Sequence, residues 1–222
     1  MGLNKGTGNM YEFVTHTWNT IKGECPHGCT YCYMKRWGKQ NPVRFDEKEL
    51  KTDLGQGNFI FVGSSCDMFA DDIWTRWIHA TLDHCKNFDN KYLFQSKNPA
   101  RIKRNEYLLP EKSVICTTIE TNRFYKEIMN YSPDPYFRGS AMRKLPGKKY
   151  VTIEPIMDFD LEPFVYMIKS CQPLQVNIGA DSGNNNLPEP TAGQIDALIG
   201  ELIKAGIKFH LKQNLNRLYK RR

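Results

Sequence analysis

The sequence predicts an α/β protein in which a mainly parallel sheet curls into a partial barrel. Short apolar runs alternate with stretches of helical periodicity, which is typical of parallel βα units. About six or seven such units fit, fewer than the eight of a closed barrel. We expect residues 1–222 to form one domain, because this length buries a sizeable core.

Seven segments have the β-branched, aromatic or apolar composition of short strands. In chain order they are residues 13–20, 59–62, 92–95, 114–119, 150–153, 174–178 and 207–211. Helical composition or periodicity follows most of them. The predicted helices are residues 30–37, 46–54, 73–85, 121–131, 161–171 and 191–205, with a further helix that begins near Pro99.

Local signals support several of these boundaries. Asp46, with Glu49 three residues later, has the spacing of a capping box. Pro99 suits the first turn of a helix, and Gly206 suits the end of the last one. Residues 132–148 contain three prolines and two glycines and are expected to form a long irregular, basic excursion.

The later strands are apolar on one face and polar on the other. In residues 114–119, Ile115 and Ile119 share one face, whereas Cys116, Thr118 and the following Glu120 share the other. The same alternation gives polar sets of Thr152 with Glu154, Gln175 with Asn177, and Lys208 with His210 and Lys212. In a partial barrel, this face would line a polar chamber near the carboxyl ends of the strands. The alternative is an open sheet whose polar face meets solvent.

Three cysteines, Cys25, Cys29 and Cys32, fall within eight residues and have the spacing C-x3-C-x2-C. Three thiolates this close can bind three irons of a [4Fe–4S] cluster and leave the fourth iron without a protein ligand. The alternative is a zinc site with His16 or His27 as fourth ligand, although no second ligand pair follows in the sequence.

This spacing, with Tyr31 just before the last cysteine, resembles the signature of the radical S-adenosylmethionine (radical SAM) superfamily. The resemblance implies a (β/α)6-type partial TIM barrel and SAM bound at the open iron. It also implies reductive cleavage of SAM to methionine and a 5′-deoxyadenosyl radical, which abstracts hydrogen from a substrate.

A SAM site needs a cation for the carboxylate of SAM and an acceptor for its ribose. After the third strand Lys97 supplies the cation, while Thr118 and Glu120 supply a hydroxyl and an acceptor at the end of the fourth. Further polar candidates are Ser64, Ser65 and Asp67 after the second strand, Glu154 after the fifth and Asn177 on the sixth. The two serines and Asp67 could equally cap the helix that follows them.

Several short segments resemble small phage-associated radical SAM-like proteins. These are residues 65–69, 96–99, 154–157 and 212–214. The cysteine loop, the serine turn and Lys97 also resemble spore photoproduct lyase, which repairs a thymine dimer. That family implies that Lys97 and a serine hold the SAM carboxylate, with a cysteine as hydrogen-atom donor and tyrosines assisting.

In this chain, Cys66 and Tyr33 are the candidates for those last two roles. Cys66 is offset from the family position, and a buried structural cysteine is the alternative. The chain is also shorter than the repair enzyme. Cys85, Cys116 and Cys171 lie in apolar segments and are expected in the core.

The chain carries a net charge of +7, which favours a nucleic acid or nucleotide as substrate. Basic residues gather between residues 138 and 149, at Arg138, Arg143, Lys144, Lys148 and Lys149, and again in residues 217–222. The alternatives are a solvated basic surface and a dock for an acidic electron donor such as flavodoxin or ferredoxin. For function, the alternatives are a radical reaction on a small molecule or peptide, and a zinc-containing nucleic-acid-binding module.

The sequence predicts a cytoplasmic protein without a membrane partner. It contains no run of eighteen apolar residues, and its first ten residues lack the apolar stretch of a secretory signal. Its odd number of seven cysteines fits no disulfide framework and suits a reducing compartment.

Overall fold

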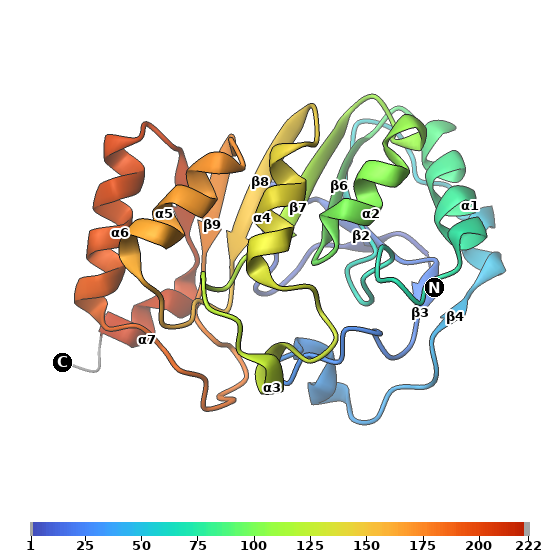
Figure 1. Cartoon of the computed structure of the whole chain (residues 1–222). Coiled ribbons are helices and arrows are strands. Elements are labelled where there is room, and N and C mark those ends of the chain that lie inside the picture. The colour runs from blue at the N-terminus through green and yellow to red at the C-terminus, as the bar shows by residue number, and fades with distance from the viewer. Residues whose placement is uncertain (1, 220–222) are drawn as a thin grey trace.

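The computed structural model describes residues 2–219, and an eight-stranded sheet forms its centre (Figure 1). The strand order is β1-β2-β5-β6-β7-β8-β9-β10. These strands are β1 Asn4–Lys5, β2 His16–Trp18, β5 Phe59–Val62, β6 Lys91–Ser96, β7 Ser113–Thr118, β8 Lys148–Ile153, β9 Gln175–Ile178 and β10 Phe209–Leu211. The pair β1–β2 is antiparallel, and every later pair is parallel. A separate antiparallel pair joins β3 Ile21–Lys22 to β4 Arg44–Phe45.

Helices cover one face of this sheet, with α2, α4, α5 and α6 side by side across the front in Figure 1. The α-helices are α1 Thr75–Lys86, α2 Pro99–Arg104, α3 Lys126–Met129, α4 Pro135–Arg143, α5 Leu161–Ser170, α6 Ala192–Lys204 and α7 Asn216–Tyr219. Short 3-10 helices are η1 Tyr33–Trp37, η2 Glu47–Lys51, η3 Glu106–Leu108 and η4 Gln213–Leu215. Among the residues that the structure describes, no helix is long and apolar enough to cross a membrane.

The two faces of the sheet differ in the way that the sequence predicts. Ile115, Val151 and Val176 point to the helices and belong to the main hydrophobic core. On the opposite face, the register aligns Thr118 with Thr152 and Thr152 with Asn177. The strand pattern and the mostly parallel sheet therefore confirm the predicted partial-barrel fold.

The inner face is layered along the strands. Near their amino ends it carries a second apolar cluster of Tyr11, Val14, Phe59, Leu93, Val114 and Cys116. Polar side chains such as Gln95 and Thr118 occupy the next positions toward the carboxyl ends. The polar chamber is consequently confined to one half of the inner face and has an apolar floor.

The segment before β2 supplies much of that floor. The ring of Phe13 stacks on Tyr11 with centroids 5.1 Å apart and meets Phe59 at 5.2 Å and Tyr150 at 5.4 Å. The edge strands β1 and β10 are not hydrogen-bonded neighbours in the sheet. Tyr11 lies over the inner face, where its Oη contacts Gln95 of β6 and Thr152 of β8, and Lys212 Nζ is 4.9 Å from its ring centroid.

The prediction for residues 132–148 is wrong, since α4 occupies their middle. Pro135 stands in the first turn of α4, where proline is tolerated, and the side chain of Asp134 accepts a hydrogen bond from the Tyr136 amide at 2.8 Å. Gly139 lies where α4 packs on α5, and a Cβ there would be 2.8 Å from Met167 Cγ. Pro135 and Gly139 thus begin and pack a helix, where the sequence predicts that they break one.

Three other helix predictions hold only in part. Residues 30–37 yield only the 3-10 helix η1 over their second half. Residues 121–131 yield just the four residues of α3. Residues 46–54 yield η2, in which the Asp46 side chain caps nothing. Instead, Asp46 and Glu49 both bind Lys22 Nζ, at 2.8 and 2.6 Å, because β3 brings this lysine beside them.

Candidate active site

A cavity of about 900 Å³ opens at the carboxyl ends of the strands. The cysteine loop supplies Cys25, Cys29 and Cys32 to its wall. Strand ends and following loops add Ser64, Gln95, Lys97, Thr118, Thr152, Glu154 and Lys212. The cavity therefore combines the predicted thiols with the predicted polar strand face.

The cysteine loop is pinched at its base. Strands β3 and β4 pair Ile21 with Phe45, so the chain between them leaves and returns at one point. Gly23 adopts φ of +101°, and a Cβ there would lie 2.5 Å from the Pro42 carbonyl oxygen. Gly28 adopts φ of +62° and donates its amide to the Cys25 carbonyl at 3.1 Å, so the loop turns tightly at a residue that tolerates positive φ.

The short helix α3 holds the loop from behind. The Thr30 amide donates to the Ile128 carbonyl at 2.9 Å, and Asn130 Nδ2 donates to the Gly28 carbonyl at 2.9 Å. The Tyr131 amide donates to the His27 carbonyl at 3.1 Å. Residues 128–131 thereby fix the loop between Cys25 and Cys32.

The three loop cysteines are free thiols. A hydrogen bond with Cys66 lowers the pKa of Cys25 to about 6, although burial opposes the shift. Such a thiol is largely thiolate at neutral pH, and the thiolate is the form that binds metals. Burial raises the pKa of Cys32.

Cys66 lies below the loop in the main hydrophobic core and does not line the cavity. Its hydrogen bond with Cys25, followed by burial, raises the pKa of its thiol. A thiol that donates a hydrogen atom to a substrate must reach that substrate. The position of Cys66 instead suits the alternative of a buried cysteine that supports Cys25.

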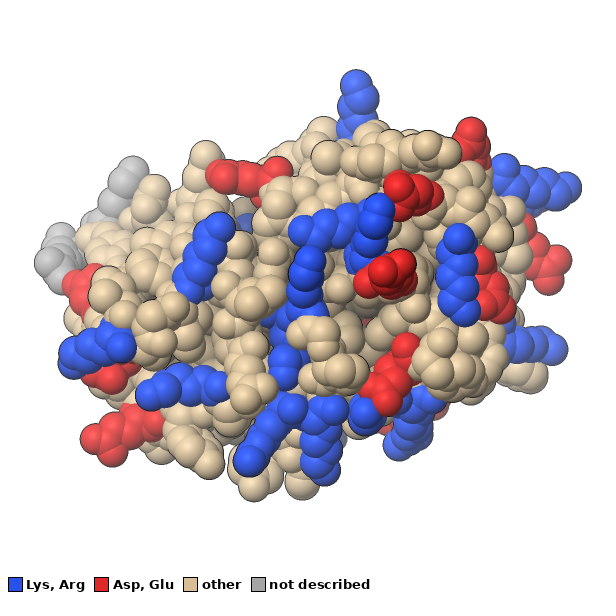
Figure 2. Space-filling model, turned by 90° about the horizontal axis from the view of Figure 1, so that it is seen from above, with Lys and Arg blue, Asp and Glu red and all other residues tan. Residues whose placement is uncertain are grey.

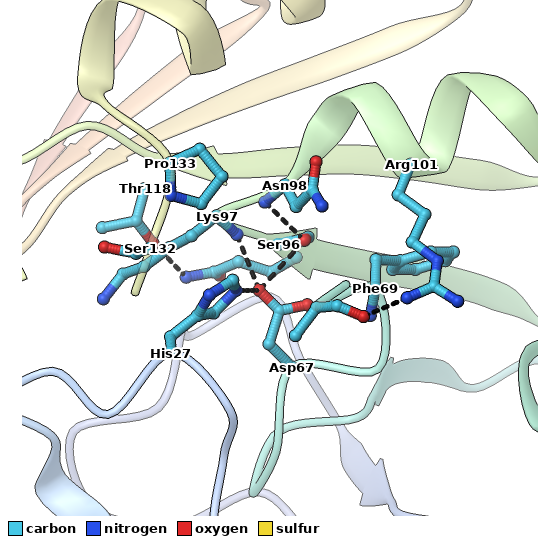
Figure 3. A network of polar contacts seen from close by, with 12 residues as sticks. His27, Asp67, Phe69, Ser96, Lys97, Asn98, Arg101, Thr118, Ser132 and Pro133 are labelled. Carbon is cyan, nitrogen blue, oxygen red and sulfur yellow. Dashed lines mark hydrogen bonds and ion pairs between the residues drawn. The ribbon is translucent and has the colours of Figure 1, made fainter. Parts of the chain in front are cut away.

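Asp67 ties three segments together (Figure 3). Its Oδ2 accepts hydrogen bonds from the Lys97 amide at 2.8 Å and from Ser96 Oγ at 2.9 Å, and it lies 2.8 Å from His27 Nε2. Burial raises the pKa of Asp67, but the His27 charge and these hydrogen bonds outweigh burial and lower it. The sequence identified Asp67 only as a polar helix-capping residue, and its role as an anchor was missed.

Lys97 brings its ammonium to the cysteines. Its Nζ lies 3.3 Å from Cys29 Sγ, 2.8 Å from Tyr31 Oη and 3.4 Å from Glu120 Oε1. Burial lowers the pKa of Lys97, but these neighbours outweigh burial and raise it, so the side chain carries its charge. The structure therefore joins the predicted cation, the predicted tyrosine and the cysteine loop.

Glu120 does not occupy the place that the sequence predicts for a ribose acceptor. It is fully buried, its Oε2 accepts from Arg138 Nη1 at 2.7 Å, and its Oε1 accepts from Tyr31 Oη. Burial raises its pKa, but the charges of Arg138 and Lys97 outweigh burial and lower it. Glu120 thus holds Tyr31 and Lys97 from behind.

Glu154 is the carboxylate that faces the cavity at a strand end. It binds Lys212 Nζ at 2.6 Å and accepts hydrogen bonds from Asn214 Nδ2 at 2.9 Å and Asn9 Nδ2 at 2.8 Å. Gly179 gives it room, because a Cβ there would be 2.8 Å from Glu154 Oε1. Of the two predicted carboxylates, Glu154 lines the cavity and Glu120 does not.

The remaining predicted residues divide into two groups. Thr118, Ser64 and Tyr33 line the cavity, and Tyr33 Oη donates to the Ser64 carbonyl at 2.5 Å. Asn177 lies outside the cavity wall and is fully buried, with its Nδ2 3.5 Å from Thr152 Oγ1. Ser65 is also outside the wall, and its amide donates to Asn19 Oδ1 at 2.9 Å.

The predicted basic excursion is only partly a surface feature. Arg138 and Lys149 are buried, whereas Arg143, Lys144 and Lys148 are exposed. Lys148 begins β8, so this end of the sheet is opposite to the cavity. Figure 2 shows that opposite end, where Lys and Arg side chains gather across the middle with acidic side chains among them. Residues 220–222 of the basic tail lie outside the described residues.

Neither a known protein-family pattern nor a curated protein sequence matches the chain. Solved structures of spore photoproduct lyase do match it in three dimensions. A complex with dinucleoside spore photoproduct has 12% identity and a TM-score of 0.59, with 89% of this chain and 63% of that chain covered.

Two variants of the same enzyme also match. A cysteine-to-serine mutant has 11% identity and a TM-score of 0.65, with 92% of this chain and 79% of that chain covered. A double mutant with bound AdoMet and dinucleoside spore photoproduct has 13% identity and a TM-score of 0.55, with 91% and 66% covered. The present chain has the fold of spore photoproduct lyase.

Proposed function

We propose that this protein is a radical SAM enzyme that holds a [4Fe–4S] cluster on Cys25, Cys29 and Cys32. The observation that carries the proposal is the cavity in which these thiols meet the ammonium of Lys97, 3.3 Å from Cys29 Sγ. Arg138 and Lys97 both pair with Glu120, which leaves one positive charge without a carboxylate. The thiolate of Cys29 beside Lys97 would balance that charge.

The donor set fits a cluster better than a zinc ion. Zinc needs four ligands that converge on one point at about 2.0–2.3 Å, whereas each thiolate of a cluster binds a different iron. Among the described residues, no three His, Cys, Asp or Glu side chains are arranged to hold one ion. His27 Nε2, the nearest candidate for a fourth ligand, is engaged by Asp67 Oδ2 at 2.8 Å.

The chain's own residues would bind and orient the reactants. When bound, the cluster and SAM supply a 5′-deoxyadenosyl radical for hydrogen abstraction. Lys97 offers a cation to the SAM carboxylate, and Glu154 offers an acceptor to the ribose hydroxyls. The apolar floor around Phe59 and Leu93 keeps water from the inner end of the cavity.

For the substrate, we propose a nucleic acid base or a nucleotide. Three of the similar spore photoproduct lyase structures contain a dinucleoside, and the net charge of +7 favours phosphate-bearing ligands. A small molecule or peptide is the alternative substrate, and flavodoxin or ferredoxin is the proposed electron donor. Localisation in the cytoplasm and an association with phage stay predictions.

Anaerobic reconstitution with iron and sulfide tests the chemistry. We expect about four irons per chain and release of 5′-deoxyadenosine after reduction in the presence of SAM. Cys29→Ala should lower the iron content severalfold and abolish SAM cleavage. Cys85→Ala is the matched control, because Cys85 is buried in the hydrophobic core away from the cavity. This variant should keep both its iron content and its SAM cleavage. A colourless protein with one zinc and no SAM cleavage would contradict the proposal.

A further inference from the structure

One exposed part of the cavity wall is the short segment of residues 33–39, which we call the entrance wall. We propose that the entrance wall binds single-stranded nucleic acid, with a base stacked on Trp37 and phosphates bound by Lys35, Arg36 and Lys39. This inference rests on the proposed function for its context, because it names the substrate class of the same cavity.

Three of the aromatic side chains that line the cavity are progressively less exposed from the entrance wall to the inner end. Trp37 is 62% exposed, Tyr33 is 42% exposed and Tyr31, at the inner end beside Lys97, is 8% exposed. The rings of Trp37 and Tyr33 lie 5.9 Å apart and nearly perpendicular, at 79°. Aromatic rings at the mouth of a basic groove bind successive bases by stacking, whatever the sequence of the strand.

The entrance wall also carries unbalanced positive charge. Lys35, Arg36 and Lys39 are exposed and line the cavity, and no carboxylate of the described residues lies within ion-pair distance of them. Arg36 is fixed over the ring of Trp37, 5.5 Å from its centroid, by a hydrogen bond of its Nε to the Tyr33 carbonyl at 3.2 Å.

Two of the four carboxylates in the described cavity wall are balanced by ion pairs. Asp67 and Glu154 are in ion pairs, and Asp181 accepts hydrogen bonds from the amides of its own turn. Glu24 is the one carboxylate of the described cavity wall without such a partner. The entrance wall therefore offers three cations without an ion-pair partner, against the two carboxylates of Glu24 and Asp181 elsewhere in the described cavity wall, and this excess suits a polyanion.

A second exposed tryptophan gives a matched control. Trp74 is 57% exposed, and Arg76 lies over its ring at 4.4 Å, but neither residue lines the cavity. The same pair of residue types thus occurs at and away from the entrance wall. If any exposed Trp–Arg pair bound nucleic acid, substitutions at Trp74 and Arg76 would weaken binding as much as substitutions in the entrance wall.

The experiment measures binding of fluorescein-labelled oligothymidylate and oligouridylate, each of 20 nucleotides, to the reconstituted protein by anisotropy at several salt concentrations. Trp37→Ala should weaken binding by roughly 5- to 150-fold, the range of one lost base stack. The triple variant Lys35→Ala, Arg36→Ala, Lys39→Ala should make the slope of log K against log salt shallower by about 2. Trp74→Ala with Arg76→Ala should leave affinity and slope unchanged.

Three results would overturn the inference: unchanged binding by Trp37→Ala, equal weakening by the Trp74 and Arg76 variant, or thymidine monophosphate binding as tightly as the strand. Tighter binding of one oligonucleotide would assign the wall to DNA or to RNA. Binding needs no SAM turnover. A protein that binds strands here but does not cleave SAM would support the entrance wall and contradict the proposed chemistry, and the reverse result would contradict the wall alone.

Discussion

At the scale of single residues, the pair of Glu120 and Arg138 determines how the site is supported. Both side chains are fully buried, and Arg138 also donates from Nη1 to the Thr118 carbonyl at 2.9 Å and from Nη2 to Ser132 Oγ at 3.0 Å. A buried charge with all its hydrogen bonds made is tolerated, whereas one that loses its partner is strongly destabilising. The pair therefore fixes the end of β7, from which Glu120 reaches Tyr31 and Lys97.

Glu120→Gln should lower the free energy of unfolding by about 3 kcal/mol at pH 7, because the charge of Arg138 loses its buried partner. The pKa of Glu120 is lower in the folded protein than in the unfolded chain, where glutamate titrates near about 4.3. Its stabilisation is complete above that pH and is lost as the pH falls through the folded-state pKa. Urea denaturation should show a weaker acid dependence for the variant below about pH 4.

Glu201→Gln is the matched control for this measurement. Glu201 forms an exposed ion pair with Lys204 at 2.7 Å within α6, and such pairs contribute about 0.5 kcal/mol or less. Equal effects of the two substitutions would show that the buried pair does not stabilise the fold.

Single residues also show a limit of sequence reasoning. Lys97 and the three loop cysteines could be predicted from local signals. The cysteines have a characteristic spacing, and Lys97 directly follows a predicted strand. Arg138 was assigned to a basic surface, because sequence neighbours such as Arg143 and Lys144 do lie there. Its burial depends on a helix that the sequence did not predict and on the distant Glu120, so no local pattern could reveal it.

At the scale of elements, the geometry of the cysteine loop depends on its base. Gly23 must adopt positive φ and must also allow the Glu24 amide to reach the Asn41 carbonyl at 2.8 Å. Gly57 adopts a similar φ of +74°, but a Cβ there would meet nothing within 4 Å. Substituting each glycine therefore distinguishes two costs. Both substitutions strain the backbone, but only the one at Gly23 also causes a steric clash.

We expect Gly57→Ala to lower the free energy of unfolding by about 1–2 kcal/mol through strain alone. Gly23→Ala should cost a further ~1–3 kcal/mol, because its Cβ would displace the backbone at Pro42. Iron content after reconstitution should fall only in Gly23→Ala. If Gly57→Ala loses as much iron, the pinched base does not control the cysteine loop.

The elements themselves were predicted unevenly. Strands β5 to β9 were found close to their observed bounds, because an apolar run or alternation along four to six residues is a local property. Helix α4 was missed because Pro135 and Gly139 favour a break, while Asp134 and the contact with α5 decide otherwise. Strand β1 and helix α7 are too short to give a periodic signal.

At the scale of the whole molecule, the inner face of an incomplete barrel must be covered by another part of the chain. The segment before β2 does this from within, since Tyr11 Oη donates to Gln95 Oε1 at 2.7 Å and lies 2.7 Å from Thr152 Oγ1. Strand parity predicted which residues face inward. Strand parity could not predict that this face is apolar near the amino ends of the strands and polar near their carboxyl ends. The apolar floor is completed by Tyr11 and Phe13, which are far from most of these strands in the sequence.

Phe13 tests whether this segment closes the barrel. Its ring contacts Tyr11, Phe59 and Tyr150, which come from the N-terminal segment and from two strands of the sheet. Phe13→Ala should lower the free energy of unfolding by about 2 kcal/mol, less than for a fully buried phenylalanine because the ring is half-buried. Tyr166→Ala, at a 71% exposed position on α5, should change it by less than about 0.5 kcal/mol. Similar values for the two variants in chemical denaturation would mean that the floor holds without the N-terminal segment, and that the chamber owes its shape to the sheet alone.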